Sequence, residues 1–132
     1  MITIRLINDN ELSATDFAYV CQAVKYFVPL VTKAWNLPPV TVATGQTIQT
    51  GDWVVYITES NRLAGATGYH DDVAGVPTAY CSLKASGRIY GTLIKPLIIQ
   101  GKVLHPGIYT EGLVTTICHE IAEMLGDPMI QT

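Results

Sequence analysis

The sequence predicts an α+β domain, with a small mixed β-sheet backed by one long helix and a second helix near the C-terminus. Apolar and polar residues alternate at the N-terminus, which is typical of a half-buried strand. Apolar residues then recur every three or four positions from Phe17 to Trp35, which indicates an amphipathic helix. The 132 residues are 48% hydrophobic, which suits one domain with one core. We therefore expect a single domain over residues 1–132.

The first strand and the long helix occupy the N-terminal third of the chain. The strand is predicted over residues 2–6 and ends at the Asn-Asp-Asn turn of residues 8–10. The helix is expected to end near Asn36, and Pro29 inside it should kink it. The candidates for its N-cap are Ser13, Thr15 and Asp16.

Three further strands are predicted in the middle of the chain. Short apolar runs at residues 40–43 and 53–57 are bounded by glycine-containing turns, and a third run covers residues 77–83. Residues 59–67 are polar and predict a loop. The Gly-Tyr-His-Asp-Asp stretch at 68–72 is expected to be a compact polar cluster in a glycine-containing loop.

The last third of the chain predicts a broken extended segment followed by a helix. Residues 92–104 are typical of a hairpin or a broken loop, because Pro96 interrupts the apolar run. The final helix is expected to begin near Thr110 or Glu111.

Composition excludes several classes of function. The net charge is −3 and the basic residues are scattered singly, so no nucleic-acid surface is expected. Three cysteines without a C-x-x-C pair argue against a disulfide framework, and Cys21 and Cys118 fall on apolar helical faces. We expect neither a signal peptide nor a membrane span. The low charged fraction, 14%, fits either a well-buried single domain or an apolar surface covered in an assembly.

The final helix carries the most chemically informative residues. On a helical wheel of residues 111–125, the polar side chains separate from the apolar ones and include His119, Glu120 and Glu123. His119 and Glu123 are four residues apart, so both can bind one metal ion, and Glu120 at the edge of the same face could polarise a metal-bound water. The simpler alternative is an amphipathic helix whose outer face happens to carry these residues.

A catalytic zinc site needs a third protein ligand. Asp127, just past the helix end, His70 and His105 are all candidates. His70 stands in the Gly-Tyr-His-Asp cluster, although an ordinary loop histidine beside a solvated acidic turn explains the same stretch. The residues alone leave these alternatives open.

Three motifs carry a resemblance to known proteins: Gly68-Tyr69-His70-Asp71, Gly75-x-Pro77 and His119-Glu120-x-x-Glu123-Met124-Leu125-x-Asp127-Pro128. Together they resemble a set of uncharacterised bacterial and bacteriophage proteins, over residues 64–128. More widely, the H-E-x-x-E helix resembles the active-site helix of zincin metallopeptidases.

The zincin resemblance implies a sheet with an edge strand beside the cleft, a backing helix and a zincin-like active-site helix. It implies that His119 is a metal ligand, that Glu120 is the general base, and that Glu123 replaces the second histidine ligand. A carboxylate there could move selectivity from zinc toward other divalent ions. Many zincins take their third ligand from downstream, whereas this chain ends at Thr132. The third ligand is then upstream, or a downstream part is missing, or the site is vestigial.

Two functions follow as expectations. The first is a bacteriophage virion-associated structural protein on a zincin-like scaffold, present in the virion and the host cytoplasm, with other virion proteins or further copies of itself as partners. The second is a metal-dependent peptidase with a metal, expected to be zinc, bound by His119 and Glu123. A weaker third hypothesis is a carbohydrate- or peptide-binding groove lined by tyrosines, of which Tyr69, Tyr80, Tyr90 and Tyr109 are candidates.

Overall fold

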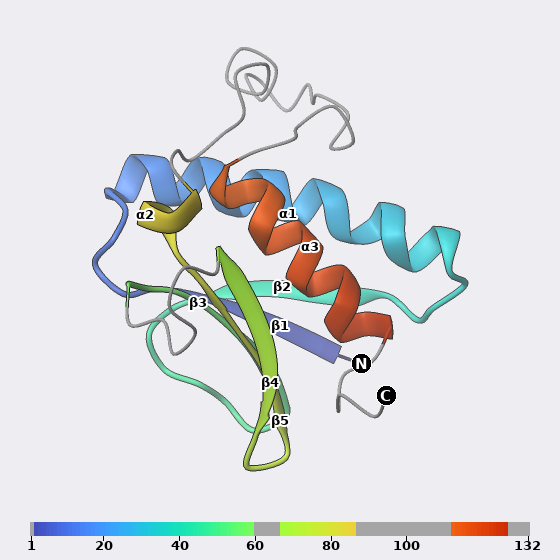
Figure 1. Cartoon of the computed structure of the whole chain (residues 1–132). Helices are drawn as coiled ribbons and strands as arrows, with labels where there is room; N and C mark the ends of the chain where they lie inside the picture. Colours follow the sequence, from blue (N-terminus) through green and yellow to red (C-terminus); the bar gives the residue numbers. More distant parts are fainter. Residues whose placement is uncertain (1, 60–66, 87–111, 127–132) are drawn as a thin grey trace.

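A computed structural model of the chain describes residues 2–59, 67–86 and 112–126 (Figure 1). These residues form β1 (Ile2–Asn8), α1 (Ala14–Ala34), β2 (Val40–Thr44), β3 (Asp52–Ile57), β4 (Gly68–Val73), β5 (Val76–Cys81), α2 (Leu83–Ser86) and α3 (Leu113–Gly126). The hairpin or loop predicted over residues 92–104 lies outside the described residues.

The strands form one five-stranded sheet in the order β2-β1-β3-β5-β4. The pairs β1–β2, β1–β3 and β3–β5 are parallel, whereas β4 lies at the edge and runs antiparallel to β5. Helix α1 joins the parallel neighbours β1 and β2 as a crossover. The predicted mixture of helices with a small mixed sheet is therefore confirmed at this level.

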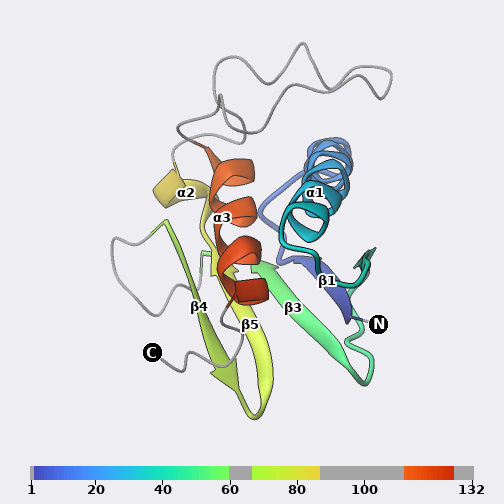
Figure 2. The ribbon, with the colours of Figure 1, turned by 90° about the vertical axis from the view of Figure 1, so that its right-hand side faces the viewer.

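Helices α1 and α3 lie side by side on the same face of the sheet (Figures 1 and 2). The core fills the space between them and that face, because alternate residues of each strand point toward the helices. The fully buried side chains of this core include Ile4, Leu6, Val20, Val24, Val28, Ile57, Leu113, Ile117, Ile121 and Met124. All three cysteines are free and buried, in agreement with the prediction that Cys21 and Cys118 are core residues.

Helix α1 begins where the sequence predicts it and runs through its proline. Ser13 is the N-cap, and its Oγ accepts a hydrogen bond from Asp16 N at 3.1 Å. Pro29 lies inside the 21-residue helix. The helix ends at Ala34, and Asn36 follows in a left-handed conformation with φ of 54°. Within the described residues, neither α1 nor any other helix combines the length and the apolar character needed to cross a membrane.

The loop prediction for residues 68–72 is wrong, because this segment is strand β4. Tyr69 pairs with Tyr80 of β5, and their rings stack with centroids 5.1 Å apart. The two strands are joined by a two-residue turn in which Ala74 and Gly75 have φ of 52° and 83°. Such turns are usually signalled by Asn-Gly or Asp-Gly, so the Ala-Gly pair did not indicate a hairpin.

Candidate metal centre

The strand β4 and the helix α3 bring three ionisable side chains together. His70 comes from β4, and Glu120 and Glu123 come from α3. One ligand atom from each residue lies within 4.8 Å of the ligand atoms of the other two. His70 Nδ1 lies 3.1 Å from Glu120 Oε1 and 3.9 Å from Glu123 Oε1. These three residues form a group that could hold a metal ion, and we call it the His-Glu-Glu group.

The strand register explains why His70 faces the helix. His70 pairs with Ala79 of β5, and Ala79 belongs to the core beneath the helices. Residues directly opposite each other in an antiparallel pair point to the same face of the sheet. His70 therefore points toward α3, whereas its neighbour Tyr69 points to the other face and stacks there on Tyr80.

A glycine sets the close distance between β4 and α3. A Cβ atom on Gly68 would lie 2.6 Å from Thr116 Cγ2 and 3.2 Å from the Tyr80 carbonyl oxygen. His70 is two residues further along β4, on the same face, and Glu120 is one helical turn further along α3. The contact at Gly68 thus places His70 beside Glu120.

Glu120 is the buried member of the group, with 4% of its surface exposed. Burial raises the pKa of its carboxyl group, the hydrogen bond with His70 opposes this shift, and the negative charge of Glu123 adds to it. The helical wheel put Glu120 at the edge of the polar face, and β4 covers that edge in the structure. A buried carboxyl group beside a second carboxyl group favours a nearby positive charge.

His119 lies outside the His-Glu-Glu group. Its side chain is 65% exposed, and its Nε2 lies 3.0 Å from Glu123 Oε1. The stacking of residues four apart on α3, which the sequence predicts, is therefore present. Asp127 and His105, the other candidate ligands, lie outside the described residues.

The structure thus joins residues for which the sequence analysis indicated different roles. His70 and Glu123, two of the predicted ligands, converge with Glu120, for which the zincin resemblance implies the role of general base. The signal for Glu120 as a ligand was available but weak: Glu120 and Glu123 are three residues apart, so they share a helical face. The sequence pattern did not show that strand β4 covers this helix face.

A hollow of about 530 Å³ adjoins the group on the N-terminal side of Glu120. Its lining comes from the first turns of α3, from α2 and from Thr67, and consists of Thr67, Ala85, Ser86, Gly112, Thr115, Thr116, His119 and Glu120. Ser86 Oγ and Thr116 Oγ1 lie 3.1 Å apart and fix this wall by a hydrogen bond. The hollow therefore opens onto one member of the group and is rich in hydroxyl side chains.

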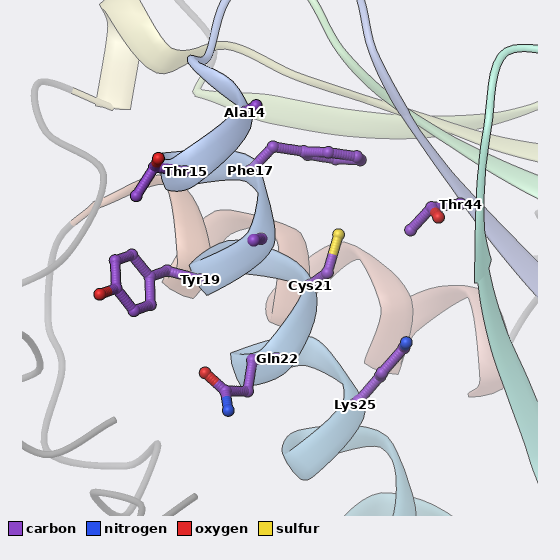
Figure 3. A pocket seen from close by; sticks show the side chains of 9 residues that line it. Ala14, Thr15, Phe17, Tyr19, Cys21, Gln22, Lys25 and Thr44 are labelled. Atoms are coloured by element: carbon purple, nitrogen blue, oxygen red, sulfur yellow. The ribbon is translucent and has the colours of Figure 1, made fainter. Parts of the chain in front are cut away.

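A second hollow, of about 840 Å³, lies along the N-terminal half of α1 (Figure 3). Its lining includes Phe17, Tyr19, Cys21, Lys25 and Thr44, and it contains no member of the His-Glu-Glu group. Lys25 is the charged side chain in its lining, and no acidic residue accompanies it there. It does not extend the candidate metal centre.

The donor set fits a divalent cation. An imidazole nitrogen with two carboxylates matches the ligand types of catalytic zinc sites. Two ligands that are each about 2.1 Å from one ion can be at most about 4.2 Å apart. The separations of His70 Nδ1 from the two carboxylates already satisfy this limit. All three ligand atoms lie within 4.8 Å of one another, and the Glu123 side chain is 48% exposed.

Comparisons of the chain with protein-family models, with curated proteins and with solved structures found no match.

Proposed function

We propose that this domain binds one divalent cation through His70, Glu120 and Glu123 and uses it to hydrolyse a peptide-like substrate. The observation that carries the proposal is the convergence of the three ligand atoms within 4.8 Å, between an edge strand and a helix. Zinc is the first candidate, because it accepts nitrogen and carboxylate ligands together.

The arrangement of the protein groups is suited to such chemistry. Three protein ligands leave one coordination position of a tetrahedral ion open to water or substrate. When bound, the cation supplies a Lewis acid that polarises a carbonyl group and makes a bound water more acidic. Glu120 and Glu123 neutralise the cation, and His70 fixes it to β4. The adjoining hollow gives a substrate room to reach Glu120 along α3.

This ligand set assigns the motif residues differently from the zincin resemblance. In that resemblance His119 binds the metal and Glu120 is the general base, whereas in our proposal Glu120 is a ligand and His70 supplies the nitrogen. Support comes from burial, since the His70 and Glu120 side chains are 14% and 5% exposed and the His119 side chain is 65% exposed.

A structural role is a second proposal, and the same burial supports it. A cation held by His70 and Glu120 would fasten the edge strand β4 to α3 and so stabilise the domain as a part of a larger assembly. By the resemblance to bacteriophage proteins, that assembly would be a virion. Because Glu120→Gln removes a ligand of that cation, poor incorporation of this variant into particles supports the structural role, whereas normal incorporation with loss of hydrolysis supports the enzyme.

Metal binding is tested by calorimetric titration of the purified, chelator-treated protein with Zn²⁺, Mn²⁺ and Co²⁺. We expect one ion per chain, and we expect Glu120→Gln and His70→Gln each to weaken binding by more than about 100-fold, since even residues behind the ligands change affinity by about 10- to 100-fold. Zinc at 100 times its dissociation constant should stabilise the fold by about 2.7 kcal/mol.

Asp72→Asn is the matched control. Asp72 is exposed on the same strand, two residues from His70, so this variant removes one negative charge near the group without removing a ligand. Its affinity should stay within about twofold of the wild type, as a screened surface charge predicts. Equal affinity for the wild type and Glu120→Gln, or no binding by the wild type, would overturn the proposal.

A further inference from the structure

His119 opens the H-E-x-x-E motif, yet its ring lies outside the group that could hold a metal. Its side chain is 65% exposed, and its Nε2 faces Glu123 Oε1 at 3.0 Å. The other imidazole that faces this oxygen belongs to His70, whose Nδ1 is 3.9 Å away. The shorter imidazole contact of Glu123 Oε1 is thus with His119, whereas His70 is hydrogen-bonded to Glu120.

The two carboxylates of the group differ in how firmly they are held. Glu120 is buried between β4 and α3, and His70 contacts it. The Glu123 side chain is 48% exposed, so solvent allows it several rotamers. A mobile carboxylate loses conformational freedom each time it binds a cation, and this cost weakens the affinity. A hydrogen bond that already holds the carboxylate in its binding orientation removes most of the cost.

The helix makes His119 suited to this task. Residues four apart on an α-helix lie one above the other, so the His119 ring reaches the Glu123 carboxylate without any change in the backbone. When Nε2 carries the proton it donates to Glu123 Oε1 and orients the carboxylate toward His70 and Glu120. The exposed ring takes no part in the core, so replacing it should leave the fold intact.

We propose that His119 is a positioning residue that holds Glu123 in the orientation that binds the cation, and is not itself a metal ligand. The inference rests on the proposed function, because it assumes the ligand set His70, Glu120 and Glu123. In this assignment His119 orients a ligand without touching the cation, whereas Glu120 and Glu123 bind the cation directly.

The test compares His119→Ala and His119→Gln with His70→Gln, using Co²⁺ as the probe. Glutamine places an amide N–H donor near the position of the histidine Nε2, so it can keep the hydrogen bond. We expect His119→Ala to weaken Co²⁺ binding by about 10- to 100-fold and His119→Gln to recover most of that loss. The visible absorption spectrum of bound Co²⁺, which reports the ligand atoms, should be the same in both variants and in the wild type.

Each alternative gives a different result. A changed Co²⁺ spectrum in both His119 variants, with glutamine no better than alanine, would show that His119 is a direct ligand. Affinities equal to the wild type in both variants would show that Glu123 needs no positioning. Absence of Co²⁺ binding by the wild type itself would mean that the proposed function fails, and the inference with it. Melting curves of the metal-free variants exclude misfolding as the cause.

Discussion

Two largely buried pairs of ionisable side chains among the described residues lie on opposite faces of the sheet and differ in whether their charges balance. Arg5 of β1 and Asp52 at the start of β3 pair on the face away from the helices. His70 and Glu120 pair on the face that carries α3, with Glu123 beside them. The first contact joins one full positive charge to one negative charge, and the second joins an imidazole to two carboxylates.

The two contacts also differ in their hydrogen bonds and in the direction in which the pKa of the carboxyl group is shifted. Asp52 Oδ2 accepts from Arg5 Nε and from Gln49 N, and Arg5 Nη1 donates to the Thr44 carbonyl oxygen. These hydrogen bonds, together with the Arg5 charge, hold the pKa of Asp52 below its usual value. The pKa of Glu120 moves the other way because burial dominates there.

The difference separates a structural contact from a candidate binding site. A buried carboxylate with a low pKa already has its positive partner and gains little from a further cation. A buried carboxyl group with a raised pKa, next to a second carboxyl group, lacks a partner with a full positive charge. Burial of charge alone therefore does not indicate a candidate metal site, whereas the convergence of ligand atoms together with the direction of the pKa shift favours the His-Glu-Glu group as one.

Breaking the balanced contact should have the largest effect on stability. Asp52→Asn leaves the buried Arg5 guanidinium without its counter-charge, so we expect the free energy of unfolding to fall by about 3 kcal/mol at pH 7. Urea denaturation of the wild type and the variant measures this, with the exposed Asp72→Asn as the control expected to stay within about 0.5 kcal/mol.

The same substitution predicts a pH dependence. Because the folded pKa of Asp52 is lower than the unfolded one, its contribution is complete above the unfolded pKa, about 3.9, and is lost as the pH falls through the folded value. The stability difference between the wild type and Asp52→Asn should therefore shrink below about pH 4. A difference that stays constant from pH 7 to pH 3 would contradict this assignment.

Widening the contact between β4 and α3 should have an intermediate effect. Gly68→Ala places a Cβ 2.6 Å from Thr116 Cγ2, so we expect a loss of about 2 kcal/mol and weaker binding of Zn²⁺, because β4 carries His70. Calorimetric titration and urea denaturation measure the two effects.

A second substitution tests the cause of that loss. Thr116→Ser removes Cγ2 and keeps the hydroxyl group, so in the Gly68→Ala background it should recover part of the stability. Gly126→Ala is the matched control, since its Cβ would come no closer than 3.7 Å to Trp35 and should not destabilise the helix. A similar loss in both glycine variants would show that the close approach at Gly68 is not the reason.

The sequence predicted local structure better than contacts between distant segments. Periodicity indicated the α1 and α3 helices and the mixture of strands around them, because these patterns depend on neighbouring residues. It gave no access to the Arg5–Asp52 pair or to the His70–Glu120 pair, whose members are 47 and 50 residues apart and meet through strand register and helix packing. The strand β4 was missed because glycine and acidic residues are unfavourable in strands, while stacking of Tyr69 on Tyr80 stabilises it.

The smallest effect on stability is expected from Glu120→Gln in the absence of metal. With a chelator present at pH 7, Glu120→Gln removes a buried charge whose hydrogen bond with His70 only partly compensates burial. We expect this variant to be more stable than the wild type by about 1 kcal/mol, the opposite sign from Asp52→Asn.

In excess Zn²⁺ the order of stability should reverse, because the wild type gains binding energy that the variant lacks. Two urea denaturation series, with and without Zn²⁺, measure both signs. A Glu120→Gln variant that is destabilised under both conditions would make Glu120 a balanced structural residue like Asp52.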